Sequence, residues 1–88
     1  MNFKQKKVTV NDVEYTLQKM PIRPALAMRQ KWQKNGNIDD IIMCDEVFKN
    51  IVVEPKVKLD DFEFVEDAEE LASECISFQY LGKSEQEK

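Results

Sequence analysis

The feature that most constrains the fold is an alternation of apolar and polar residues on both sides of Asn11-Asp12. Period-two alternation is typical of a half-buried strand, and two such runs joined by a short Asn/Asp turn indicate a β-hairpin, here over residues 6–19. The apolar positions share one face of this hairpin; they are Val8, Val10, Val13, Tyr15 and Leu17. Because a two-stranded hairpin is not stable alone, we expect this face to pack on helices.

A first helix is predicted over residues 22–34, since Pro24 suits the first turn of a helix. Its apolar residues recur at helical spacing on one broad side; they are Ile22, Ala25, Leu26, Met28 and Trp32. Arg29 falls in the middle of that side. It either extends past the core to solvent or pairs with a carboxylate.

A second helix is predicted over residues 38–52. Asn35-Gly36-Asn37 supplies a C-terminal glycine for the helix before it and an N-cap for the helix after it. The apolar stripe of this second helix contains Ile41, Cys44, Val47, Phe48, Ile51 and Val52. Ile42 and Met43 lie outside the stripe. A helix that is apolar on more than one side is either sandwiched between other elements or offers a surface to a partner.

Pro55 marks the end of this helix, and an acidic connector follows over residues 56–65, irregular or extended, with Phe62 and Phe64 in it. The sequence leaves open whether this connector is a strand. A third helix is predicted over residues 67–81, where Asp67 and Glu70 have capping-box spacing. Its core stripe contains Ala68, Leu71, Ala72, Cys75 and Phe78. The charged tail, residues 83–88, has nothing to bury and is expected to be disordered.

These elements predict an α+β fold, with an N-terminal β-hairpin packed on a three-helix, mostly α-helical bundle. The chain has 88 residues, which is enough for one modest core, so we expect a single domain over residues 1–82. Such a small core also makes self-association an option.

Charge is distributed unevenly along the chain. Residues 1–34 carry eight Lys/Arg against two Asp/Glu, a charge of +6, whereas residues 35–88 carry five against fifteen, a charge of −10. The two parts either neutralise each other within one fold or attract each other between molecules, head to tail.

The composition argues against catalysis. The chain has no histidine, which removes the commonest general base and zinc ligand. Cys44 and Cys75 form no CxxC pair and are expected to be free thiols in a reducing compartment, and two glycines cannot build a phosphate-binding loop. We expect no cofactor, no metal, no enzyme activity, no nucleic-acid binding and no membrane insertion or surface binding.

The function class that remains is binding to another protein. Seven apolar residues are candidates because they lie off the core stripes, in the connector, or are aromatic anchors: Trp32, Ile42, Met43, Phe62, Phe64, Tyr80 and Leu81. Trp32 is also a candidate for the core, at the corner between two helices. Tyr80 and Leu81 are alternatively partly buried residues at a frayed helix end.

The order of these motifs resembles the small tail assembly chaperones of long-tailed bacteriophages. The resemblance covers nearly the whole chain. It rests on the alternating stretch 8–21, a helix with a tryptophan, Ile51-Val52-Val53-Glu54-Pro55, Leu59-Asp60-Asp61-Phe62 and a final acidic helix. Relatives often carry Asn-Gly at the hairpin turn, where this chain has Asn11-Asp12.

The resemblance implies that the protein binds the tape measure protein, a long helical chain, and keeps it soluble while tail tube subunits assemble around it. It also implies an oligomeric protein of the host cytoplasm that is absent from the mature virion, with the tail tube protein as a second partner. In that family a frameshifted, longer form often extends the chain after Gly82. The alternative function, suggested by the −10 part, is an acidic inhibitor or nucleic-acid mimic that acts on a basic enzyme.

Overall fold

The N-terminal hairpin turns at Asn11-Asp12, where both residues have positive φ, of 49° and 69°. This backbone is required at both central residues of the two-residue turn that matches the twist of a hairpin, and Asn and Asp tolerate it. The turn joins β1 (Gln5–Val10) to β2 (Val13–Gln18), which pair in antiparallel register. The structure, a computed structural model, describes residues 4–81. The tail predicted over residues 83–88 lies outside this range.

A third strand, β5 (Val52–Glu54), pairs antiparallel with β2 and gives a sheet of order β1-β2-β5. The backbone N–H of Gln18 donates to the carbonyl of Ile51 at 2.9 Å as the two segments meet. The prediction that residues 38–52 form one helix is therefore wrong at its end. Ile51 and Val52 continue the apolar period of the preceding helix, but β-branched residues favour a strand, and the edge of β2 pairs with them.

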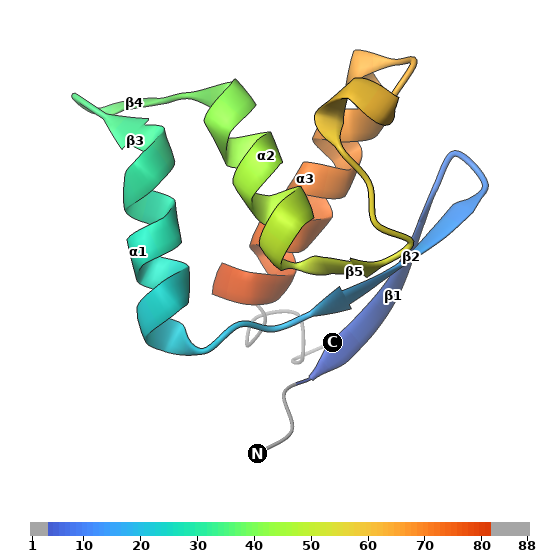
Figure 1. Ribbon diagram of the computed structural model, residues 1–88, viewed down its shortest axis with the longest axis horizontal. Coiled ribbons are helices and arrows are strands. Elements are labelled where there is room, and N and C mark those ends of the chain that lie inside the picture. Colours follow the sequence, from blue (N-terminus) through green and yellow to red (C-terminus); the bar gives the residue numbers. More distant parts are fainter. Residues whose placement is uncertain (1–3, 82–88) are drawn as a thin grey trace.

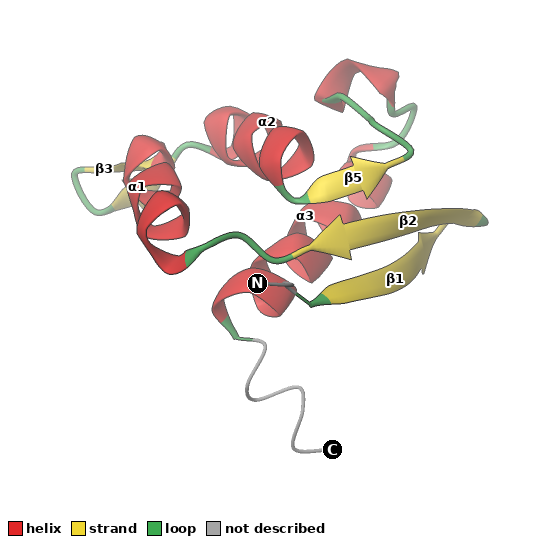
Figure 2. Cartoon of the chain, turned by 60° about the horizontal axis from the view of Figure 1, so that its bottom comes forward, coloured by secondary structure: helices red, strands yellow, loops and turns green. Residues whose placement is uncertain are grey.

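Three helices accompany the sheet in the part of the chain that the structure describes: α1 (Ile22–Trp32), α2 (Asp40–Asn50) and α3 (Val65–Tyr80). α3 contacts α2 and β1, and α2 contacts α1 and β5 (Figure 1, Figure 2). The predicted α+β class is thus confirmed, as three helices with a three-stranded antiparallel sheet. Within residues 56–64 the connector forms one 3-10 turn, η1 (Leu59–Asp61), and no strand.

The link between α1 and α2 is a short hairpin instead of a tight corner of two helices. β3 (Gln33–Lys34) pairs with β4 (Asn37–Ile38) around Asn35 and Gly36, whose φ values are 52° and 81°. Asn-Gly strongly favours this turn, so the predicted helix stop at Gly36 and helix cap at Asn37 are wrong. The N-cap is Asp39, whose carboxylate accepts from the Ile42 N–H at 3.2 Å.

The predicted capping box of the third helix is also wrong. α3 begins at Val65, and its N-cap residue Phe64 makes no side-chain cap hydrogen bond. The Asp67 carboxylate instead accepts a hydrogen bond from the side-chain amide of Asn11 at 2.9 Å. The carboxylate of Asp67, predicted to cap α3, therefore bonds to the hairpin tip instead.

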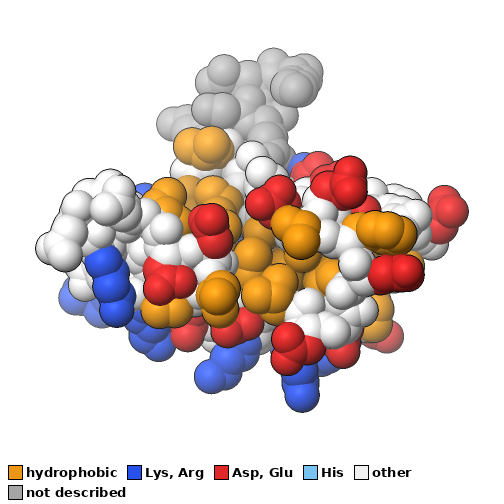
Figure 3. Space-filling view, turned by 90° about the horizontal axis from the view of Figure 1, so that it is seen from above, with side chains coloured by type: hydrophobic (Ala, Val, Ile, Leu, Met, Phe, Trp, Pro, Cys, Tyr) orange, Lys and Arg blue, Asp and Glu red, His pale blue; other side chains and the backbone are white. Residues whose placement is uncertain are grey.

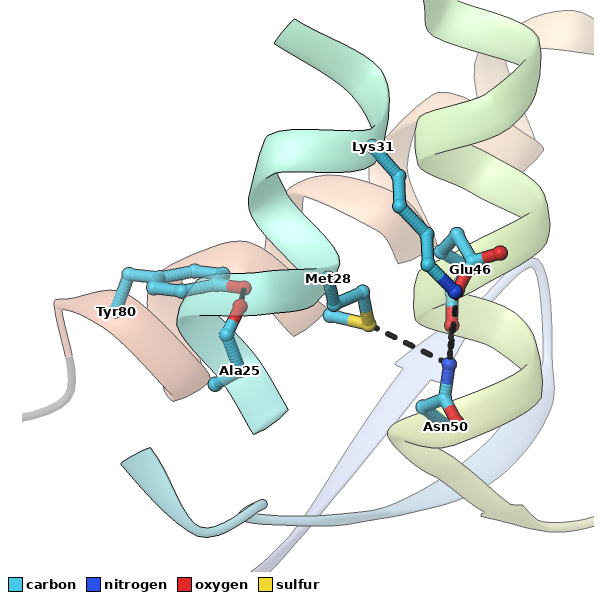
Figure 4. A network of polar contacts seen from close by, with 6 residues as sticks. All are labelled: Ala25, Met28, Lys31, Glu46, Asn50 and Tyr80. Atoms are coloured by element: carbon cyan, nitrogen blue, oxygen red, sulfur yellow. Dashed lines mark hydrogen bonds and ion pairs between the residues drawn. The ribbon is translucent and has the colours of Figure 1, made fainter. Parts of the chain in front are cut away.

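Polar contacts hold α1 against the other helices (Figure 4). The Tyr80 hydroxyl at the end of α3 donates to the Ala25 carbonyl at 2.6 Å, and its ring lies beneath the Arg29 guanidinium, 5.1 Å away. Arg29 therefore packs on an aromatic ring. Lys31 pairs with Glu46 of α2 at 3.5 Å, a partly exposed ion pair that stabilises the fold by less than about 1 kcal/mol.

One apolar cluster joins the sheet to the helices. All five residues predicted as the core stripe of the third helix are buried in it, as are Leu17, Phe48 and Trp32. Four residues predicted to face the core are exposed instead. Val13 in the hairpin is 42% exposed, and the helix residues Ile22, Leu26 and Ile41 are 76%, 43% and 64% exposed. A helical wheel gives only the width of an apolar side; which part of that side is covered depends on where the neighbouring helices lie.

Replacing Phe48 tests this core. Phe48→Ala leaves a cavity among fully buried neighbours and should lower the free energy of unfolding by about 3–5 kcal/mol, measured by urea denaturation. Ile41→Ala on the exposed face of the same helix should change it by no more than about 0.5 kcal/mol. Equal effects of the two changes would contradict the placement of α2.

Candidate protein-binding site

Exposed apolar side chains gather where α2 and α3 begin, next to the connector between them. Ile41 lies in the first turn of α2 and is 64% exposed. Phe64 and Val65 lie where the connector enters α3 and are 49% and 74% exposed. Figure 3 views this end of the molecule and shows apolar side chains near its middle with carboxylates beside them. Contiguous exposed apolar surface of this kind typically marks an interaction site.

These side chains border a hollow of about 360 Å³, which we name the acid-rimmed groove. Its floor is made by buried or half-buried residues, including Cys44, Phe62 and Ala68. The full lining is Asp40, Ile41, Cys44, Leu59, Phe62, Glu63, Phe64, Val65, Ala68 and Glu69. The groove thus combines an apolar floor with exposed apolar walls, as in sites that receive an apolar side chain from a partner.

The connector that forms one wall is held in place by local bonds. The Lys58 N–H donates to the Asp61 carboxylate at 2.9 Å, and the Asp61 N–H donates to the Lys58 carbonyl at 2.9 Å, which closes the η1 turn. Directly after this turn the Phe62 ring packs on Phe48 of α2, with centroids 5.5 Å apart. These contacts hold Phe62 against α2, and Phe64, two residues further along the chain, lies at the surface.

The rim of the groove is acidic. Asp40, Glu63 and Glu69 are exposed on it, and the structure gives none of them an ion-pair partner among residues 4–81. No Lys or Arg occurs in residues 35–48 or 59–81, the segments from which the groove is built. Asp40 also stabilises the first turn of α2 through the helix dipole, but Glu63 and Glu69 lie outside the first turn of any helix. The rim therefore attracts cationic groups.

A second and larger hollow, of about 470 Å³, lies on the other side of η1. Its lining contains both signs of charge, three lysines (Lys49, Lys56, Lys58) and three aspartates (Asp45, Asp60, Asp61). None of the large apolar side chains that are exposed in residues 4–81 borders it. We therefore regard the acid-rimmed groove as the candidate site, although it is the smaller of the two.

Two of the seven residues predicted to bind a partner line this groove. They are Phe62, which is half-buried in its floor, and Phe64, which is exposed in its wall. Ile42 and Met43 are half-buried and pack against the core from α2. The structure thus brings the connector residues together with the start of α2, but through Ile41 instead of Ile42 or Met43.

The other three predicted residues lie elsewhere. Trp32 is buried in the core, edge to face with Tyr80 at 6.4 Å, so burial removes it from any exposed surface. Tyr80 is half-buried and bonded to α1, and Leu81 is exposed but follows the end of α3, whereas the groove lies at its beginning. Helical periodicity did not indicate Ile41 or Val65 as binding residues. One sequence signal could have indicated Val65 as exposed: it is an apolar residue at the start of a helix, directly after Phe64.

Both cysteines are free and buried, and burial is the main cause of their raised pKa values. The pKa of Cys75 is raised to about 12. The pKa of Cys44, in the groove floor, is raised by burial and then by the charges of Asp40, Asp45 and Glu69. Two of these three carboxylates belong to the rim, so the Cys44 thiol senses the negative potential of the groove.

Within residues 4–81, no three or more His, Cys, Asp or Glu side chains gather where they could hold a metal ion. None of the helices in this range has the length and apolar character needed to cross a bilayer. Comparison with protein-family models, curated protein sequences and solved structures found no match to the chain. The candidate site therefore rests on the geometry and charge of the groove.

The cysteines provide a test of the groove's electrostatics. A raised thiol pKa means less thiolate at a given pH, so iodoacetamide at pH 8.5 should alkylate both cysteines more slowly in the folded protein than in urea, with Cys75 the slower. Asp40→Asn and Glu69→Gln should raise the Cys44 rate and leave the Cys75 rate unchanged, as measured by mass spectrometry of the two tryptic peptides. An unchanged Cys44 rate would contradict a negative potential at the floor.

The same shifts give a pH dependence of stability. In both cysteines the folded pKa lies above the ordinary value of 9.0, so the folded state favours the protonated thiol. The resulting stabilisation is fully present below pH 9 and is lost as the pH rises toward the folded values, because the unfolded chain releases its thiol protons first. The urea concentration at the unfolding midpoint should therefore decrease as the pH is raised above 9. In Cys75→Ala this decrease should be smaller. If the midpoint of Cys75→Ala decreased with pH as steeply as that of the wild type, the raised pKa of Cys75 would be contradicted.

Proposed function

We propose that this protein is a non-catalytic chaperone that holds a helical segment of another protein in the acid-rimmed groove. Following the resemblance in its sequence, we propose that it is a tail assembly chaperone of a long-tailed bacteriophage and that its partner is the tape measure protein. It would act in the host cytoplasm during tail morphogenesis, be absent from the mature virion, and have the tail tube protein as a second partner.

One observation carries this proposal: Ile41, Phe64 and Val65 are exposed around a hollow whose floor is apolar. In water these side chains gain free energy only when a partner covers them, at about 25 cal/mol for each Å² of apolar surface removed. A helix presents apolar side chains at i, i+3 and i+4, and one or two such side chains suit a hollow of about 360 Å³. A long chain with many helical segments would offer this pattern repeatedly.

The rest of the fold supports the groove in this proposal. α3 contacts both β1 of the hairpin and α2. The hydrogen bond from Asn11 to Asp67 fastens the hairpin tip within the first turn of α3, two residues from Val65. A groove of fixed shape costs less conformational entropy on binding than a flexible one.

The acidic inhibitor or nucleic-acid mimic is less well supported by the same surface. A mimic of a phosphate backbone needs a continuous row of carboxylates, whereas at the groove Asp40, Glu63 and Glu69 alternate with large apolar side chains. This mixture favours a partner that is both apolar and basic over a purely electrostatic contact.

Co-expression tests the proposal. The wild-type protein should increase the soluble fraction of a candidate tape measure protein and elute with it on a sizing column. Ile41→Asp and Phe64→Asp each place a charge in the groove and should abolish both effects. Because the two side chains are 64% and 49% exposed, neither change should unfold the protein, and circular dichroism checks this.

Leu81→Asp is the matched control. It introduces the same charge at an exposed apolar residue, 55% exposed, but after the end of α3 instead of at its start. It should keep the tape measure protein soluble. Loss of activity in Leu81→Asp together with normal activity in Ile41→Asp would place the binding surface elsewhere, and no complex with the wild-type protein would refute the proposed function.

A further inference from the structure

A smaller hollow, of about 160 Å³, lies between the hairpin turn and the connector, and we name it the tip hollow. Its full lining is Val10, Asn11, Val13, Tyr15, Asp61, Phe62, Glu63, Phe64 and Asp67. Residues 62–64 also line the acid-rimmed groove, so the two hollows are neighbours with a common wall. The exposed apolar surface at the groove therefore continues past Phe64 to Val13 of β2, which is 42% exposed.

The tip hollow is held in shape by contacts on both sides. The turn between β1 and β2 lies next to the start of α3 (Figure 1), where the side-chain amide of Asn11 donates to the Asp67 carboxylate at 2.9 Å. On the connector side, the Lys58 N–H donates to the Asp61 carboxylate, also at 2.9 Å. Tyr15 belongs to the buried core cluster. A partner thus meets a preformed hollow, which lowers the entropic cost of binding.

The charge of the tip hollow is negative. Its lining contains three carboxylates, Asp61, Glu63 and Asp67, and no Lys or Arg. Asp61 and Asp67 accept hydrogen bonds from neutral groups, which do not compensate their charge, and none of the three forms an ion pair within residues 4–81. Burial raises the pKa of the Tyr15 hydroxyl, and the negative charges of Asp67 and Asp61 raise it further. The hollow therefore attracts a cation.

The carboxylates share the tip hollow with apolar and aromatic side chains, namely Val13, Tyr15, Phe62 and Phe64. Lys and Arg side chains match this mixture, because each has an apolar stem and a charged head. A cation gains free energy both from carboxylates and from aromatic rings nearby. At about 160 Å³ against about 360 Å³, the tip hollow has less than half the volume of the groove, and it suits one long side chain.

We propose that the acid-rimmed groove and the tip hollow together bind one basic amphipathic helix of a partner, with apolar side chains in the groove and one Arg or Lys in the tip hollow. This inference rests on the proposed function and adds a register to it. If the apolar residues are at i and i+3, the positions on the same face one turn beyond them are i−4 and i+7. Selectivity then depends on where the basic residue lies, and not on net charge alone.

Three synthetic helices with the same composition test this register. Each is an Ala/Gln peptide with Leu at i and i+3 and a single Arg, placed at i−4, at i+7, or at i+5 on the opposite face. In NMR titrations of the protein, at least one same-face peptide should bind about threefold to tenfold more tightly than the i+5 peptide. That peptide should also shift the amide signals of Asn11 and Val13, which the i+5 peptide leaves in place. Circular dichroism checks that the three peptides have equal helix content.

Salt provides a second measurement on the same peptides. Because the preference comes from charges near the surface, it should decrease when sodium chloride is raised from about 20 mM to about 500 mM. The contribution of the two leucines is apolar and should remain.

Substitutions in the tip hollow locate the effect. Val13→Lys places a like charge beside the incoming Arg, and Glu63→Gln removes one carboxylate; each should reduce the preference while the i+5 peptide still binds. Thr9→Lys is the matched control, since it adds the same charge to the hairpin at an exposed residue between Val8 and Val10, on the opposite face of β1. It should keep the preference of the wild type. Circular dichroism checks the folding of all three variants, and Glu63→Gln, at an exposed connector residue, carries the comparison if Val13→Lys does not fold.

The outcomes separate this inference from the proposed function. Equal affinity of the wild type for the three peptides, or a preference that is unchanged in the tip-hollow variants, would overturn the register and leave the groove as a helix site. A wild-type protein that binds none of the peptides would overturn both. Register-dependent binding of the peptides, with no complex between the protein and a tape measure protein, would refute the proposed partner and leave the composite site standing.

Discussion

Burial of the hairpin's apolar face is the constraint on which the remaining structure depends. Val8, Val10, Tyr15 and Leu17 are buried on that face, and a two-stranded hairpin gains stability only when such a face is covered. β5 extends the sheet beside β2, while α3 packs against β1 and α2 packs against β5. Because one small cluster contains nearly all the buried residues, little apolar material is left to cover the ends of the helices.

The acid-rimmed groove follows from this shortage. The connector must pass from β5 to α3 across the start of α2, and it places Phe62 inward on Phe48. Phe64 and Val65 follow at the surface, opposite Ile41, and no further element of residues 4–81 lies over them. The same limited core leaves Ile22 and Leu26 outside on α1. The domain thus buries its core while leaving apolar side chains exposed at two separate surfaces.

The distribution of charge also shapes these surfaces. The start of the chain is basic and the remainder is acidic. Within residues 4–81 the two signs meet in partly exposed pairs, Lys6 with Glu74 and Lys31 with Glu46. The larger part of the charge asymmetry is therefore available for contacts between molecules, where it favours basic, amphipathic helices at the groove.

Local pattern and local turn chemistry determined much of this fold from the sequence. Alternation around Asn11-Asp12 gave the hairpin and its buried face, helical periodicity gave three helices, and the core stripe of α3 was predicted residue by residue. These features depend on neighbours a few residues away, so the sequence carries them directly. The tertiary structure alone decided features that need a distant partner. β5 exists because the edge of β2 pairs with Val52, and Asp67 bonds to Asn11 instead of capping its own helix. Phe62 and Phe64 could be selected from the sequence as connector aromatics, but their meeting with Ile41 depends on how the chain crosses α2. The groove could not be predicted for the same reason: exposure is set by which elements pack together, and not by the apolar period of any one helix.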